Sequence, residues 1–500
     1  MVVTDRLLWV GLQQDRVLAV NTLSGSVDVF GPQVWKALRG CDGVEPGTLS
    51  ADQLRLLERR GYLFSDAAGE EAAWEAMVRA AEQEEGREAF AVGVETSALG
   101  LDCPARSGAA FRPPGPWGLG PEKLPRLFRA LRELRRLAAG RPVLWELMGG
   151  EPLQPAAAAP LDLIFAEAQR QPGVGLRLWT GGAALLEFRP VLLQHRSVLR
   201  SLGVVLEPLP PQGWPGGGPS QERLRRVAEG MDWALEHGLA VDVGIGFRLH
   251  EEGRLEGVFA LFEARGWPAS GRFRCLLSPV VAYPGPLADP PDEGRPAADR
   301  GLSAERPPAA RGWSGPEAVA ALCRLFPGGL PPYLELGRLR AMASLRSLLS
   351  GLPGGWPAVS FCPAVGGRSL WLAADGLVYP CPLRRGALEG VVGTWLTAFS
   401  CFRPLPGAEG EGPRSVLRLD VCRRCPAATL CGGGCAAEAA AGSGRPACPE
   451  SLQVAAVYLS LAARQYDAAR EGAVAGPSRL FLSVVGPDGA GRDSLDRAAG

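Results

Sequence analysis

The chain has 500 residues, with 53 Lys and Arg balanced by 53 Asp and Glu. That length allows roughly two to four domains with large cores, and the balanced charge gives no electrostatic case for a nucleic acid or an anionic membrane surface. The first residues, MVVTDRLLWVGLQQD, lack a basic region followed by a long apolar run, so we expect no signal peptide, and no stretch of about 18 apolar residues predicts a spanning helix. We therefore expect a cytoplasmic protein, in which clustered cysteines favour metal ligation over disulfides.

The first 86 residues predict a small separate unit. The segments LLWVGL, RVLAVNT and SVDVF predict short strands. PQVWKALRG and SADQLRLLERRGYLF predict helices, and Ser50 is the expected N-cap of the second one. The acidic segment EEAAWEAMVRAAEQEEG predicts a solvated linker helix.

From about residue 89 the pattern alternates between strands and helices. FAVGVET, RPVLWELMGG, VGLRLWTGG, VLRSLGVVLEP and LAVDVGIGFRL predict strands, with amphipathic helices between most of them. This alternation favours a parallel sheet or a partial barrel, in which sites lie at the carboxyl ends of the strands. Near the end, SLQVAAVYLSLAARQYDAAREG predicts one long helix, and we expect the residues after it to be loosely ordered.

Eight of the twelve cysteines fall within residues 362–448. Four of them are close enough in sequence to share a metal at little cost in loop entropy: Cys422, Cys425, Cys431 and Cys435. The glycine triplet at 432–434 lets the backbone approach a metal or sulfide closely. Zinc would need only this quartet, two iron–sulfur clusters would use up to about eight thiolates, and chance clustering is a third alternative. The seven patterned cysteines suit iron–sulfur better, whereas Cys41, Cys275 and Cys323 stand singly and are expected in the core.

The full pattern resembles the SPASM domain of radical S-adenosylmethionine enzymes. It reads Cys362-x13-Gly376-x4-Cys381, then C-x2-C-x5-C-x3-C, then a last cysteine. The resemblance implies two auxiliary 4Fe-4S clusters. By position, the first would be bound by Cys362, Cys381 and Cys435. The second would be bound by Cys422, Cys425, Cys431 and Cys448. The family often has another cysteine between the first two positions, which is missing here, so the first cluster would have an open iron or another ligand such as Cys401.

The resemblance extends upstream over roughly residues 90–345. The segment MGGEPL matches the GGEP motif that follows the second strand in radical S-adenosylmethionine enzymes. In that family the backbone and the glutamate of this motif receive the amino group of the methionine moiety. The corresponding residues here are Gly149, Gly150, Glu151 and Pro152.

One part of the family's catalytic apparatus is altered. The radical reaction needs a C-x3-C-x2-C loop after the first strand, whose thiolates hold the cluster that cleaves S-adenosylmethionine. The equivalent stretch, ETSALGLDCPAR, aligns at Thr96 but places Leu99, Cys103 and Arg106 at the ligand positions. The family's T-N-G turn is also changed, to Thr-Gly-Gly at 180–182. Because one thiolate cannot hold the cluster, Cys103 marks a degenerate cluster position and the GGEP segment a vestigial S-adenosylmethionine site.

We therefore expect an α/β protein built around a partial (β/α) barrel of radical-SAM type. The expected parts are a winged-helix-like peptide-recognition unit at 1–86, a radical-SAM-like domain at 87–345, a SPASM iron–sulfur domain at 346–455, and a terminal helix with a flexible tail at 456–500. The front unit resembles leader-peptide recognition elements in pattern only. In those elements the peptide adds a strand to a sheet edge. A plain structural cap is the alternative.

The resemblance implies a protein related to peptide or protein maturases that binds one or two auxiliary iron–sulfur clusters. The missing ligands favour an accessory protein or pseudoenzyme, with a precursor peptide or an intact maturase as partner and doubtful binding of S-adenosylmethionine. Two alternatives stay open at this point. One is an active radical enzyme with an atypical cluster, and the other is a structural zinc protein.

Overall fold

The structure is a computed structural model, and the residues that it describes are those in the ranges 1–40, 48–96, 119–120, 122–138, 140–149, 151–206, 221–247, 252–279, 315–327, 329–337, 339–351, 355–382, 391–396, 403–404, 415–436, 451–470, 483–485 and 491–492. Among the helices in these ranges, none combines the length and the apolar character needed to cross a bilayer.

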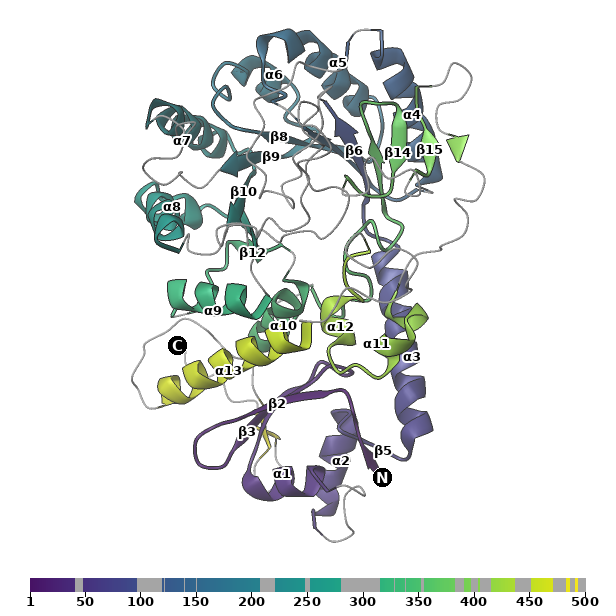
Figure 1. The fold of residues 1–500 in the computed structure, drawn as a ribbon, viewed down its shortest axis with the longest axis vertical. Coiled ribbons are helices and arrows are strands. Elements are labelled where there is room, and N and C mark those ends of the chain that lie inside the picture. Colours follow the sequence, from purple (N-terminus) through teal and green to yellow (C-terminus); the bar gives the residue numbers. More distant parts are fainter. Residues whose placement is uncertain are drawn as a thin grey trace, which may run out of the picture.

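The front of the chain forms a unit with its own sheet and core, at the bottom of Figure 1. The three predicted strands are present and pair antiparallel in sequence order: β2 (Leu7–Gly11), β3 (Val17–Asn21) and β4 (Val27–Phe30). Two helices share this core: α1 (Pro32–Leu38) and α2 (Ala51–Arg59). Ser50 caps α2 as predicted, because its side chain accepts a hydrogen bond from the N–H of Gln53. A separate pair of short strands is formed by β1 (Val2–Val3) and β5 (Leu63–Phe64).

The acidic segment forms α3 (Ala67–Glu85), which runs along one side of the molecule beside α11 (Asp420–Arg423) (Figure 1). Trp74 and Val78 of this helix are fully buried. They pack in one hydrophobic cluster with Cys422 of the cysteine-rich region. The prediction of a solvated linker helix is therefore wrong for this face. The signal in the sequence that could have predicted this buried face is a pair of apolar residues four positions apart in an acidic helix.

The middle of the chain forms an eleven-stranded sheet. Its strands, in spatial order, are β12 (Leu334–Leu336), β11 (Phe273–Pro279), β10 (Val241–Phe247), β9 (Leu199–Leu206), β8 (Val174–Thr180), β7 (Val143–Met148), β6 (Phe90–Glu95), β13 (Ser369–Leu372), β14 (Leu377–Tyr379), β15 (Gly393–Thr394) and β16 (Arg403–Pro404). Pairing is parallel from β12 to β13 and antiparallel from β13 to β16. The expected α/β class with a large parallel sheet is thus confirmed. The cysteine-rich region extends this sheet, since β13 pairs directly with β6.

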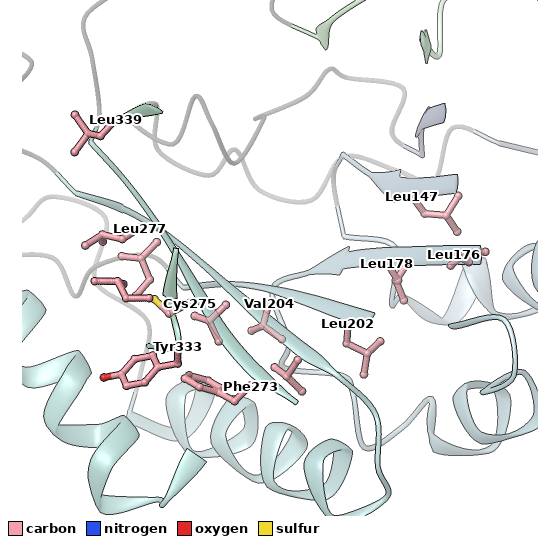
Figure 2. Packing of buried hydrophobic residues seen from close by; sticks show 14 of the residues in the cluster. Leu147, Leu176, Leu178, Leu202, Val204, Phe273, Cys275, Leu277, Tyr333 and Leu339 are labelled. Carbon is pink, nitrogen blue, oxygen red and sulfur yellow. The ribbon is translucent and has the colours of Figure 1, made fainter. Parts of the chain in front are cut away.

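Helices connect the parallel strands, as the alternating pattern predicted. They are α4 (Leu124–Leu137), α5 (Ala158–Gln169), α6 (Arg189–Gln194), α7 (Gln221–Glu236), α8 (Glu252–Ala264) and α9 (Gly315–Leu325). Apolar side chains at alternate strand positions form the core with these helices. Figure 2 shows Leu178, Leu202 and Val204 on the same side of the sheet, toward the helices. The residues between them therefore belong to the opposite face.

The long C-terminal helix links the front unit to the rest of the molecule. It is α13 (Ser451–Arg470), which contacts α9, α10 (Arg340–Ser350) and β2. Nη2 of Arg16 in the front unit lies 3.6 Å from Oδ1 of Asp467 in this helix.

Two short strands follow α13 that the sequence analysis did not predict: β17 (Ser483–Val485) and β18 (Gly491–Arg492). β17 adds to the edge of the front unit's sheet, parallel to β4, with Val484 opposite Val29. β18 pairs antiparallel with β17. The strand order of the front sheet is therefore β18-β17-β4-β3-β2. Strands this short carry little signal of their own, because their pairing depends on the free edge of β4.

Candidate functional site

The glutamate of the GGEP segment joins two turns at the carboxyl ends of neighbouring strands. Oε1 of Glu151 accepts hydrogen bonds from Thr180 Oγ1 at 2.6 Å and from the N–H of Leu153 at 2.8 Å. Its Oε2 accepts from the N–H of Gly181 at 2.8 Å. Burial raises the pKa of Glu151, against the opposing effects of these hydrogen bonds and of Arg223. The carboxylate thus stabilises the turn after β7 against the turn after β8.

The end of β6 lies beside the turn that follows β7. The Thr96 hydroxyl donates to the carbonyl of Gly149 at 2.5 Å, and the Thr96 N–H donates to Met148 at 3.0 Å. Gly149 has a φ of +95°, which favours glycine, and Pro152 is buried. Gly150 lies outside the described residues. The structure therefore gathers Thr96, Gly149 and Glu151 at one edge of the sheet, and their assignment to an S-adenosylmethionine site stays a prediction.

A row of alternating charges, which the sequence analysis missed, crosses the face of the sheet opposite the helices. Nη1 of Arg177 lies 2.9 Å from Glu146 Oε1, and its Nε lies 3.3 Å from Asp242 Oδ2. Nε of Arg274 lies 3.0 Å from Asp242 Oδ1, and its Nη1 lies 3.3 Å from Glu335 Oε1. Burial raises the pKa of Glu146, while Arg177 acts in the opposite direction. A single charged residue within an otherwise largely apolar strand, repeated in β7, β8, β10, β11 and β12, was the signal for this row.

Two indole rings lie on the same face, directly over glycines. A Cβ on Gly93 would lie 1.9 Å from the ring of Trp371, and one on Gly203 would lie 2.3 Å from the ring of Trp179. Both rings pack with Met148 at the end of β7. Among the described residues, neither indole N–H has a hydrogen-bond acceptor, although both are buried. This face therefore combines an apolar aromatic part with a charged row.

In the cysteine-rich region, the glycine triplet packs against the chain that leads into Cys362. Gly432 directly follows Cys431 and has a φ of +68°. A Cβ at Gly432 would lie 2.4 Å from the carbonyl carbon of Ser360. Burial raises the pKa of Cys362, and the nearby Cys435 raises it further. The fold thus brings Cys362 close to Cys435, which are the first and the last cysteine of this region that the structure describes.

A second part of this region is the C-x2-C turn, which α3 holds in place. Cys422 is buried in α11 (Asp420–Arg423), and the N–H of Cys425 donates to its carbonyl at 3.2 Å. Both cysteines pack in the cluster that contains Trp74. Nη1 of Arg423 lies 2.8 Å from Glu71 Oε1 and 2.9 Å from Glu75 Oε1. Two carboxylates of α3 therefore fix the turn between the two thiols.

The other predicted ligands are distributed as follows. Cys431 is buried at the end of α12 (Ala428–Cys431), and Cys381 is partly exposed after β14. Four predicted positions lie outside the described residues: Leu99, Cys103, Arg106 and Cys448. The same holds for Cys41 and Cys401.

The donor set fits a thiolate-bound metal group. Six cysteines of one region are described, and each of their thiols is buried or partly buried. Such soft donors suit iron–sulfur clusters or zinc. Within the described ranges, no three Cys, His, Asp or Glu side chains lie close enough together to hold a metal ion. The assignment of cysteines to two clusters accordingly stays a prediction.

Two further cysteines lie apart from this region. Cys275 is fully buried in the core of the large sheet, as expected. Burial raises the pKa of its thiol far above the ordinary value, and it raises the pKa of Cys323 to about 11. Neither thiol is suited to bind a metal or to react at neutral pH.

Comparison with known proteins gives a likeness in fold. No protein-family model matches the chain, and no curated protein does. A solved structure of histidine-tagged anSMEcpe with bound AdoMet is similar, with a TM-score of 0.50, 13% identity, and coverage of 77% of this chain and 96% of that chain. Native anSMEcpe with bound AdoMet gives 0.50 and 13%, over 76% of this chain and 99% of that chain. SuiB of Streptococcus suis covers 87% of this chain and 96% of its own length at 11% identity, with a TM-score of 0.40. At such identities the anSMEcpe likeness shows a shared fold.

Proposed function

We propose that this chain is an iron–sulfur protein of the radical S-adenosylmethionine/SPASM type, related to peptide and protein maturases. It binds an extended peptide and does not itself cleave S-adenosylmethionine. Its role is that of a cytoplasmic accessory protein or pseudoenzyme that works beside an intact maturase.

The packing of Gly432 on Ser360 carries the metal part of this proposal. This contact brings the segment before Cys362 to the turn after Cys431, so cysteines far apart in sequence share one region. Only a residue without a side chain allows this approach. The fold shared with anSMEcpe, whose structures contain AdoMet, supports instead the radical S-adenosylmethionine ancestry in the proposal.

The proposed loss of cleavage rests on the residues of the degenerate loop. Leucine at 99 and arginine at 106 are not cluster ligands, and Cys103 alone does not fit a three-thiolate cluster. At the strand ends, both carboxylate oxygens of Glu151 already accept hydrogen bonds from the turn after β8. These contacts support a structural role for the GGEP segment.

The peptide part of the proposal rests on the edge of β4. In this structure that edge accepts an added strand, β17, from a distant part of the same chain. Main-chain pairing at a sheet edge is a general mode of peptide recognition. A precursor peptide would use this edge in place of β17.

The decisive experiment for the enzymatic part is an assay for 5′-deoxyadenosine. The anaerobically reconstituted chain is incubated with S-adenosylmethionine and excess dithionite, beside an intact radical S-adenosylmethionine enzyme as positive control. We expect no 5′-deoxyadenosine above the protein-free background. Its formation in proportion to chain concentration would show an active enzyme with an atypical cluster.

A further inference from the structure

The turn that joins β3 to β4 (residues 22–26, the hairpin turn) packs into the cysteine-rich region. The Thr22 hydroxyl donates to the carbonyl of Pro426 at 2.6 Å, and the Thr429 hydroxyl donates to the carbonyl of Thr22 at 2.7 Å. Both threonines are buried. Leu23 is also buried, in the hydrophobic cluster that contains Cys422. Two hydrogen bonds and one apolar side chain therefore dock the hairpin turn on the segment 422–431.

The hairpin turn is tied to β4 by its own hydrogen bonds. Oδ1 of Asn21 accepts from the N–H of Leu23 at 2.9 Å and from the N–H of Ser24 at 3.1 Å. The N–H of Asn21 donates to the carbonyl of Ser26 at 2.8 Å. Val27, the first residue of β4, follows Ser26 directly. A movement of β4 is therefore transmitted to Leu23 and to the contacts around it.

The other side of β4 is the edge that accepts an added strand. β17 pairs there, with Val484 opposite Val29, while β3 pairs on the inner side. Without an added strand, β4 would be held in the sheet through β3 alone. Elements with fewer hydrogen bonds open locally more often. The strand that an added peptide would steady is thus the strand that leads directly into the docked hairpin turn.

We infer that the hairpin turn couples the β4 edge to the segment 422–431. A strand added to this edge holds the turn in its docked position and keeps the segment closed, and removal of the strand loosens both. The inference rests on the proposed function, in which a precursor peptide takes this edge in place of β17. Coupling between two sites is reciprocal, so the contacts that dock the turn also strengthen peptide binding. The cysteine-rich region would thereby respond to the presence of a bound peptide.

The first test is amide hydrogen exchange of the full-length chain, measured by mass spectrometry. The N–H groups of Ala428, Cys431 and Gly432 donate to carbonyls of their own segment, so they exchange only when it opens. Val484→Pro disrupts β17, because proline lacks a main-chain donor. We expect these amides to exchange at least about fivefold faster in Val484→Pro, which is the lower end of typical coupling between sites. A saturating peptide of residues 478–492 should restore slow exchange, and the amides of α7 should exchange at the wild-type rate throughout.

The second test measures the coupling in the opposite direction. Thr429→Val replaces the hydroxyl that bonds to Thr22 by a methyl group of similar size, far along the chain from the β4 edge. In the Val484→Pro chain it should weaken binding of the labelled 478–492 peptide about fivefold, as measured by fluorescence anisotropy. Ser415→Ala is the matched control and should leave the affinity unchanged. The hydroxyl of Ser415 belongs to the same region, but it accepts a hydrogen bond from Leu417 of its own segment.

The outcomes separate this inference from the proposed function. Unchanged exchange of the 428–432 amides in Val484→Pro, or an increase equally large in α7, would overturn the coupling and leave the proposed peptide site intact. Equal peptide affinity with and without Thr429→Val would do the same. A peptide that fails to bind the Val484→Pro chain would overturn the proposed site, while faster exchange confined to 428–432 would still support the coupling. If Thr429→Val does not fold, the exchange measurement decides.

Discussion

Gly432 and Ser360 approach so closely that a Cβ on the glycine would lie 2.4 Å from the serine carbonyl carbon. Gly432 ends α12 just after one predicted ligand, and Ser360 lies two residues before another, Cys362. Ser360 is itself held by α3, since Glu85 accepts hydrogen bonds from its N–H and hydroxyl. The geometry of the cysteine-rich region therefore depends on backbone packing as well as on any metal.

Gly432→Ala should destabilise the cysteine-rich region by more than the strain of an alanine at positive φ alone. The strain of an alanine at positive φ costs about 1–2 kcal/mol, and the clash with Ser360 should add about 1–3 kcal/mol. Gly266→Ala is the matched control, because Gly266 has a φ of +69° and no atom lies within 4 Å of the position that its added methyl group would take. Thermal unfolding and iron content check both variants. Equal losses of stability, with full iron in each, would contradict a role for this contact.

The ion pair between Glu85 and Arg368 should stabilise the junction of α3 with the cysteine-rich region. Glu85 Oε2 lies 3.1 Å from Arg368 Nη2, and the side chains are 14% and 6% exposed. Glu85→Gln should lower the free energy of unfolding by about 2 kcal/mol, because a buried charge-assisted hydrogen bond is lost. The neighbouring pair of Glu84 and Arg87 is exposed, so Glu84→Gln should cause no measurable change. Urea unfolding of both variants checks this, and a loss in Glu84→Gln equal to that in Glu85→Gln would contradict it.

The C-terminal strand should compete with an added peptide for the edge of β4. A labelled peptide of residues 478–492 should bind a chain truncated after Arg470 and bind the full-length chain more weakly, since β17 already pairs with β4 there. Fluorescence anisotropy measures this difference. The same peptide with Val484→Pro is the control, because proline removes a main-chain donor. Equal binding to both chains, or undiminished binding of the proline peptide, would contradict strand addition at this edge.

The two core thiols should resist alkylation in the native chain. The pKa of Cys323 is raised to about 11 and that of Cys275 still further, so at pH 8 almost no thiolate is present. Iodoacetamide labelling of Cys323, followed by mass spectrometry, should rise about tenfold per pH unit between 8 and 10. Because these folded-state pKa values lie above the unfolded value of about 8.5, the thiols' contribution to stability is lost as pH rises above that value. Fast labelling of both at pH 8, as in the guanidinium-unfolded chain, would contradict the burial.

Much of the fold could be predicted because its signals are local. Parallel strands buried on the helix side alternate with amphipathic helices, and each boundary lies near turn residues. The cysteine spacing likewise predicted a shared region, which the structure brings together in part at Cys362 and Cys435. These signals do not depend on which distant segments meet.

Other features depend on contacts between distant segments, and the sequence pattern did not predict them. Arg6 meets the carbonyl of Arg423 across most of the chain, and β17 finds its partner in β4. The acidic α3 buries Trp74 because the cysteine-rich region covers that face. In each case the partner, rather than local propensity, determines the structure.

The central claim is that the cysteine-rich region holds iron–sulfur clusters, and metal content tests it most directly. The chain is reconstituted anaerobically with iron and sulfide, and iron, acid-labile sulfide and zinc are measured per chain. Two auxiliary clusters predict about eight iron and about eight sulfide per chain, and one cluster predicts about four of each. A chain that retains only zinc and takes up no iron or sulfide would contradict the claim.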